Sequence, residues 1–136
     1  MNAIKSSVKF LTVTALFEGA TAIALLIVPQ TLIQLLFEVA INEPIGILVA
    51  QIAGSALFAI AIACWLARKY AKEPSTRGLL LALLFYNITV PLLLAYGALY
   101  YSLISAGGIL VAITHLLFAA WGAIVLLQQG STAALK

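Results

Sequence analysis

Five polar side chains that could support chemistry stand inside long apolar stretches of this sequence. They are Glu18, Gln51, Tyr86, Asn87 and His115. In an apolar setting, a carboxyl, an imidazole or a phenol can exchange a proton. The same groups, together with amides, can hydrogen-bond the polar end of an otherwise apolar molecule. We therefore take these five residues as candidates for a ligand-binding or proton-relay site.

The composition of the chain indicates that these residues lie within a membrane. Of 136 residues, 65% are hydrophobic and only 8% are charged, far too few for the surface of a soluble domain. A helix needs about 20 apolar residues to cross the hydrocarbon layer, whose thickness is about 30 Å. Four stretches meet this requirement, at about 8–28, 45–67, 78–101 and 107–127. We predict an all-α fold in which residues 1–136 form a single four-helix transmembrane domain.

The basic residues fall on one side of this predicted arrangement. The chain has seven Lys and Arg residues, which precede the first span, follow the last one or lie between the second and third. The connections at about 29–44 and 102–106 contain none. Because basic residues concentrate in cytoplasmic segments, this distribution predicts that both termini are cytoplasmic.

The connection between the first two spans has a helical pattern of its own. Gln30, Gln34 and Glu38 recur every four residues, with apolar residues filling the other positions. This pattern predicts a short amphipathic helix at the outer membrane interface. The alternative is a simple extension of the first helix past Pro29. A proline interrupts the helical hydrogen bonds, which favours a separate segment.

The predicted depths of the polar residues bring three of them together. At about 1.5 Å of rise per residue, Glu18, Asn87 and His115 fall near the middle of the membrane, and Gln51 lies closer to the outer surface. A charged side chain at this depth costs about 2.5–3.5 kcal/mol, so Glu18 should face the bundle interior. We expect its partner to be His115 or Asn87. Pro91 cannot donate to the Asn87 carbonyl and predicts a bend in the third span.

Two interpretations of these polar residues remain open. They can form a functional site, or they can only lock the helices in register, as interhelical hydrogen bonds commonly do. For Asn87, Tyr86 and Gln51 the packing role is the common one. A purely structural role is less expected for Glu18 and His115, because apolar residues in their place would be less costly to bury.

Several kinds of chemistry lack support in the sequence. There is no Ser-His-Asp set and no phosphate-binding loop, so we assign no catalytic residue. A single His and a single Cys, Cys64, do not make a metal site. The basic residues are topology signals rather than a nucleic-acid surface. The identity of any cofactor stays unknown, and an intramembrane enzyme is the least supported class.

The two halves of the chain share faint similarity. The segment "LFEGAT" at 16–21 matches "LFYNIT" at 84–89 in three of six positions, and "ILVA" occurs at 47–50 and again at 109–112. A duplication of a two-helix hairpin would explain these matches and would align Glu18 with Tyr86. Chance matches in such apolar text are the alternative.

Four segments carry a family resemblance: "FEGATAIALLIVP", "GSALFAIAIACW", "LLFYNITVPLLLAYGAL" and "THLLFAAWGAI". Together they resemble small uncharacterised bacterial four-helix membrane proteins, including DoxX-like ones. The resemblance implies a bundle in the bacterial inner (plasma) membrane and a link to redox or quinone metabolism, and it brings no established catalytic residues. The amphipathic outer segment departs from that pattern.

We therefore expect a multipass protein whose midplane polar residues bind a small ligand or a quinone, or relay protons. The alternative is an accessory membrane subunit in which these residues only lock the packing. The expected partners are the lipid bilayer, a small apolar ligand or quinone, and a second copy or another membrane protein.

Overall fold

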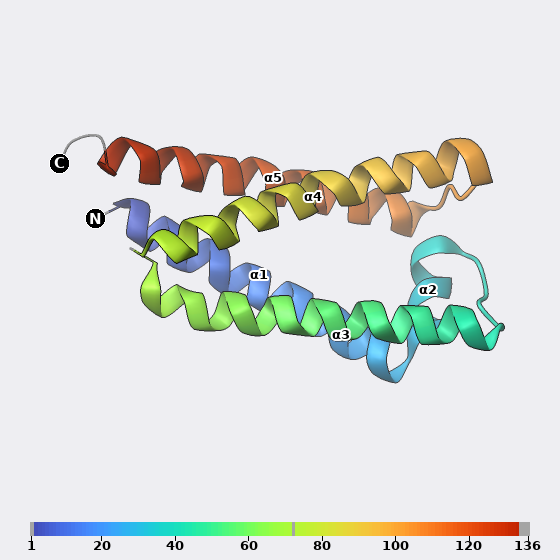
Figure 1. Ribbon diagram of the computed structural model, residues 1–136. Coiled ribbons are helices and arrows are strands. Elements are labelled where there is room, and N and C mark those ends of the chain that lie inside the picture. Colours follow the sequence, from blue (N-terminus) through green and yellow to red (C-terminus); the bar gives the residue numbers. More distant parts are fainter. Residues whose placement is uncertain (1, 72, 134–136) are drawn as a thin grey trace.

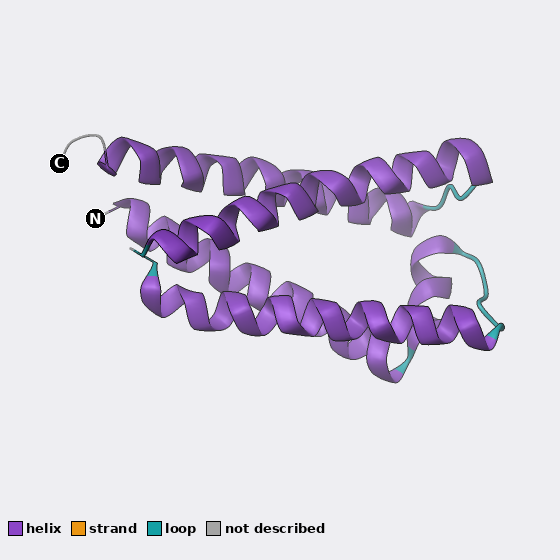
Figure 2. Cartoon of the chain, viewed as in Figure 1, coloured by secondary structure: helices purple, strands orange, loops and turns teal. Residues whose placement is uncertain are grey.

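Prolines mark where three of the helices begin. In the computed structural model, helix α1 (Asn2–Ile27) is followed by α2 (Pro29–Phe37), α3 (Pro44–Ala67), the 3-10 turn η1 (Arg68–Tyr70), α4 (Pro74–Tyr101) and α5 (Ala106–Ala133) (Figure 1). Proline suits a first helical turn, where its absent N–H is not needed. The structure describes residues 2–71 and 73–133, with side chains for 4–71 and 73–129. Within these ranges every regular element is a helix (Figure 2).

Four of the helical segments are long and apolar enough to cross a membrane. They are Ile4–Ile27, Pro44–Tyr70, Pro74–Tyr101 and Ala106–Gln129. The predicted all-α, four-helix class is therefore confirmed. Each observed segment includes nearly all of the predicted span and extends past it by one to four residues at one or both of its ends.

The four long helices form two antiparallel pairs. Helix α1 packs along α3, and α4 packs along α5 (Figure 1). The start of α1, the end of α5 and the η1 turn after α3 lie at one end of the bundle, whereas α2 and the connection from α4 to α5 lie at the other. The first end carries Lys5, Lys9, Arg68, Lys69 and Arg77, and we call it the basic end. Lys72 and Lys136 fall outside the described side chains.

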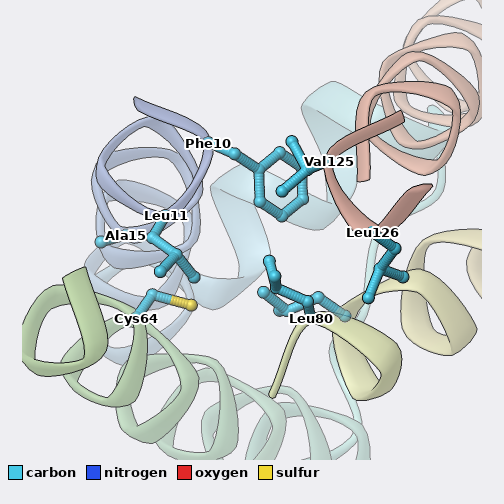
Figure 3. Packing of buried hydrophobic residues seen from close by; sticks show 8 residues of the cluster. Phe10, Leu11, Ala15, Cys64, Leu80, Val125 and Leu126 are labelled. Carbon is cyan, nitrogen blue, oxygen red and sulfur yellow. The ribbon is translucent and has the colours of Figure 1, made fainter. Parts of the chain in front are cut away.

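The hydrophobic core is located toward the basic end. It is a cluster contributed by all four long helices: Phe10, Leu11, Ala15, Cys64, Leu80, Leu83, Val125 and Leu126 (Figure 3). The Phe10 ring packs edge-on against Trp121, with 5.4 Å between the ring centroids. A Cβ at Gly122 would lie 3.2 Å from this Phe10 ring, so the small residue makes room for it. The two helix pairs are thus joined most closely in this half of the bundle.

Helix α2 is separate from α1, as the sequence pattern predicts. Val28 leaves the helical conformation before Pro29, and Glu38 ends α2 with a positive φ of 58°. The polar residues Gln30, Gln34 and Glu38 are exposed, while Leu36 and other apolar residues are partly buried. Helix α2 packs against α1, α3 and α5.

A hydrogen-bonded junction fastens α2 to the start of α5. The Ser105 hydroxyl donates to the Leu36 carbonyl at 2.6 Å and accepts from the Gly108 amide at 3.0 Å. A Cβ at Gly107 would lie only 2.5 Å from the Leu36 carbonyl oxygen. The contact therefore requires a glycine at this position, and Ser105 acts as the N-cap of α5.

Close approach of α1 and α3 gives a first testable prediction. A Cβ at Gly54 would lie 2.8 Å from the Leu25 Cβ and 3.1 Å from the Ala22 carbonyl oxygen. We expect Gly54→Ala to lower the free energy of unfolding by about 1–3 kcal/mol, because the added methyl overpacks this contact. Thermal unfolding in detergent, followed by circular dichroism, measures the change.

Gly78→Ala is the matched control, because a Cβ there meets nothing within 4 Å. Replacing glycine by alanine in a helix otherwise stabilises it by about 0.5–1 kcal/mol. Equal stability of the two variants would show that α1 and α3 do not depend on close contact at Gly54.

Candidate functional site

Glu18 lies inside the bundle and is hydrogen-bonded to a tyrosine. Its side chain is 2% exposed, and the Tyr86 hydroxyl donates to its Oε2 atom across 3.5 Å. The predicted inward orientation is observed, but the expected partner was wrong: Tyr86, rather than His115 or Asn87, holds the carboxyl. The reason is that Asn87 and His115 bond each other.

The Asn87–His115 pair is short and buried. The His115 Nδ1 and Asn87 Oδ1 atoms are 2.8 Å apart, and Asn87 Nδ2 donates to the Leu83 carbonyl at 2.8 Å. Since an amide oxygen only accepts, Nδ1 of His115 is the donor in this assignment. A neutral His115 then keeps Nε2 as an acceptor. Helix α4 continues unbroken through Pro91, and the bend expected there stays a prediction.

Aromatic rings connect the two hydrogen bonds. The Tyr86 ring packs edge-on against the His115 ring, with 5.3 Å between their centroids. Phe17 packs against His115 at 6.2 Å and against Phe118 at 5.4 Å. Tyr86 therefore contacts Glu18 through its hydroxyl and His115 through its ring. We call the residues Glu18, Tyr86, Asn87 and His115 the polar layer; it joins α1, α4 and α5.

Gln51 does not join the polar layer. Its Nε2 atom donates to the carbonyl of Leu26 at 3.2 Å. Leu26 lies in the last turn of α1, where the carbonyls lack intrahelical donors. Among the candidates from the sequence, Gln51 thus has a hydrogen bond that caps a helix, and the structure brings the other four together.

Thr14 is a polar residue that the sequence places on the same helix face as Glu18 but that we did not select as a site candidate. It is 1% exposed, and its hydroxyl is the one buried side-chain polar atom without a hydrogen-bond partner in the described part of the chain. Thr14 precedes Glu18 by four residues, so both occupy the same face of α1. The four-residue spacing is sufficient to place Thr14 beside Glu18, but only the structure shows that its hydroxyl has no protein partner.

The described residues contain no group of three or more His, Cys, Asp or Glu side chains that could hold a metal ion.

Comparisons of the chain with protein-family models, curated proteins and solved structures gave no match. The chain is a multipass membrane protein with a buried polar layer.

A double-mutant cycle would measure how strongly Asn87 and His115 depend on each other. We expect Asn87→Leu and His115→Leu each to cost about 1–3 kcal/mol, because the remaining partner is left buried and unpaired. The double variant should cost less than the sum of the two. Chemical or thermal unfolding in detergent provides the free energies.

Thr89→Val and Thr114→Val form a control pair, because their hydroxyls bond carbonyls of their own helices. Their costs should add. Additive costs for Asn87 and His115 as well would mean that the 2.8 Å contact contributes no coupling.

Proposed function

We propose that this protein binds a small, largely apolar molecule at the polar layer, through hydrogen bonds to the molecule's polar head. The single observation that carries this proposal is the unused hydrogen-bonding capacity of Glu18. The carboxyl is 2% exposed and receives one contact, at 3.5 Å, from Tyr86. Hydrogen bonds between two oxygens are usually about 2.7–2.8 Å long. The contact is therefore weak, and a carboxyl can take part in several more.

A purely structural role explains Asn87 and His115 better than it explains Glu18. The first two residues satisfy each other at 2.8 Å, as a packing lock should. Glu18 is costly to bury in a membrane and contributes only a long contact to the packing. Its retention in the bundle fits a role that a bound molecule or a proton completes.

A quinone or quinol has the chemistry that suits this layer. Quinone carbonyls accept hydrogen bonds, which the Tyr86 hydroxyl can donate. Quinol hydroxyls donate, and the Glu18 carboxylate or the free nitrogen of His115 can accept. The Phe17 and Phe118 rings, 5.4 Å apart, offer apolar contacts for a flat head group. This proposal agrees with what the family resemblance implies.

Proton relay is the second candidate function. The observation that favours it is the contact of Tyr86 with both ionisable residues, through its hydroxyl to Glu18 and its ring to His115. Glu18 and Tyr86 can exchange a proton along their hydrogen bond, whereas transfer onward to His115 requires a bridging water or ligand hydroxyl, because the two rings share no hydrogen bond. Quinone reduction consumes protons, so relay and ligand binding are compatible.

We further propose that the basic end faces the cytoplasm of a bacterial inner membrane. The support is the location of Lys5, Lys9, Arg68, Lys69 and Arg77 at that end. Helix α2 then lies at the outer surface with its polar side toward water. The exposed apolar faces of the long helices would contact lipid, a second copy or another membrane protein.

Cysteine labelling tests this orientation in a Cys64→Ala background. Ser102→Cys, in the α4–α5 connection, should react with a membrane-impermeant maleimide on intact cells. Ser75→Cys, at the basic end, should react only after lysis. Both serines are exposed, so accessibility alone does not separate them. The opposite labelling pattern would reverse the proposed orientation.

Ligand binding is tested by thermal unfolding of the purified protein with a short-chain ubiquinone and its reduced form. A ligand at 100 times its dissociation constant stabilises the folded state by about 2.7 kcal/mol. We expect this stabilisation for the wild type, and a reduction of at least about tenfold in affinity for Glu18→Gln or Tyr86→Phe, equivalent to about 1.4 kcal/mol.

Thr89→Val, whose hydroxyl bonds its own helix on an exposed face, should bind like the wild type. If Glu18→Gln kept full affinity, the ligand would bind elsewhere. If the wild type showed no stabilisation by either quinone form, quinone binding would be rejected.

A further inference from the structure

Three threonines of α1 differ in how their hydroxyls are satisfied. Thr12 donates to the Val8 carbonyl at 2.8 Å, and Thr21 donates to the Phe17 carbonyl at 3.0 Å. These are the usual bonds of a threonine to the preceding helical turn. Thr14 makes no such bond, although it is the most buried of the three. Its hydroxyl is therefore available to a group that does not belong to its own helix.

The position of Thr14 relative to Glu18 indicates what that group contacts. Residues four apart on a helix have their Cβ atoms about 5–6 Å apart. One oxygen atom can bond both side chains across such a separation, because each hydrogen bond is about 2.8 Å long. Tyr86 bonds Oε2 of Glu18, which leaves Oε1 for this additional oxygen.

We propose that Thr14 and Glu18 together bind one oxygen, supplied either by water or by the hydroxyl or carbonyl head of the bound molecule. The second source rests on the proposed ligand-binding function, whereas the first does not. Thr14 is thereby a further binding residue of the site, on the side of Glu18 nearer the basic end.

Threonine suits this position because its hydroxyl both donates and accepts. If Glu18 is ionised, a bound water or hydroxyl donates to the carboxylate and accepts from Thr14. If Glu18 is protonated, a carbonyl head accepts from both side chains, whereas a water or hydroxyl accepts from Glu18 and donates to Thr14. The hydroxyl of Thr14 thus serves both protonation states of its neighbour without movement of the helices.

Solid-state NMR of the full protein in bilayers tests the proposal. The readouts are the ¹³C resonance of the Glu18 carboxyl, assigned by its disappearance in Glu18→Gln, and magnetisation transfer to it from water protons. Thr14→Val removes the hydroxyl and keeps the side-chain volume. Thr12→Val is the matched control on the same helix, and Thr14→Ser should restore the wild-type result. Thr14→Ala is a second hydroxyl-free variant in case the valine variant does not fold.

Two results support the proposal and identify the source of the oxygen. If water supplies it, transfer to Glu18 is strong in the wild type, Thr12→Val and Thr14→Ser, and is lost in Thr14→Val. If a ligand head supplies it, water transfer is weak, and adding decanol shifts the Glu18 resonance in those three proteins but not in Thr14→Val.

In the NMR readouts, two results overturn the proposal. One is a Thr14→Val protein that matches the wild type in both readouts. The other is a wild type with neither water transfer nor a decanol shift. Failure of the proposed function looks different: quinones then do not stabilise the protein, while the effect of Thr14→Val on water transfer persists. Quinone binding that is unchanged in Thr14→Val, without water transfer, would instead remove Thr14 from the site.

Discussion

The lack of water inside a bilayer is the constraint on which the rest of this structure depends. A polar side chain at that depth must find its partner within the protein. The threonines mostly bond their own helices, Gln51 bonds the end of α1, and Asn87 bonds His115. These bonds leave little polar surface for lipid to meet. Against this background, the weak contact of Glu18 and the unpartnered hydroxyl of Thr14 stand out as a local exception.

The same constraint explains why the two helix pairs meet as they do. Near the basic end the apolar cluster around Phe10 draws residues from all four long helices. Farther along, α1 and α5 approach each other through Phe17 and His115, and Glu18 reaches α4 through Tyr86. At the opposite end, α2 packs against α5 at Gly107 and also against α1 and α3. The polar layer thus lies between an apolar junction and the α2 junction.

Hydropathy and proline positions were sufficient to predict the four long helices, the separate α2 and the gathering of Glu18, Asn87 and His115 in one part of the bundle. They were insufficient for the partner of Glu18. Sequence spacing gives the face of a helix and its depth, but not the rotation of each helix toward its neighbours. That rotation places the Tyr86 hydroxyl against Glu18 and places His115 within hydrogen-bond distance of Asn87. The partner of Gln51 was equally hidden, because it is a backbone carbonyl and no side chain signals it.

If the two hairpins arose by duplication, the alternative to chance matches, the Glu18–Tyr86 contact would have a geometric reason. The alignment of "LFEGAT" with "LFYNIT" would then make Glu18 and Tyr86 equivalent positions of two hairpins, the α1–α3 pair and the α4–α5 pair. Equivalent residues of parallel repeats meet where they approach the axis that relates the repeats. A carboxyl in one repeat opposite a phenol in the other then forms an acceptor–donor pair, which two identical carboxyls could not form without sharing a proton. Divergence at this one position would therefore convert a symmetric contact into a polar site with two different chemical sides.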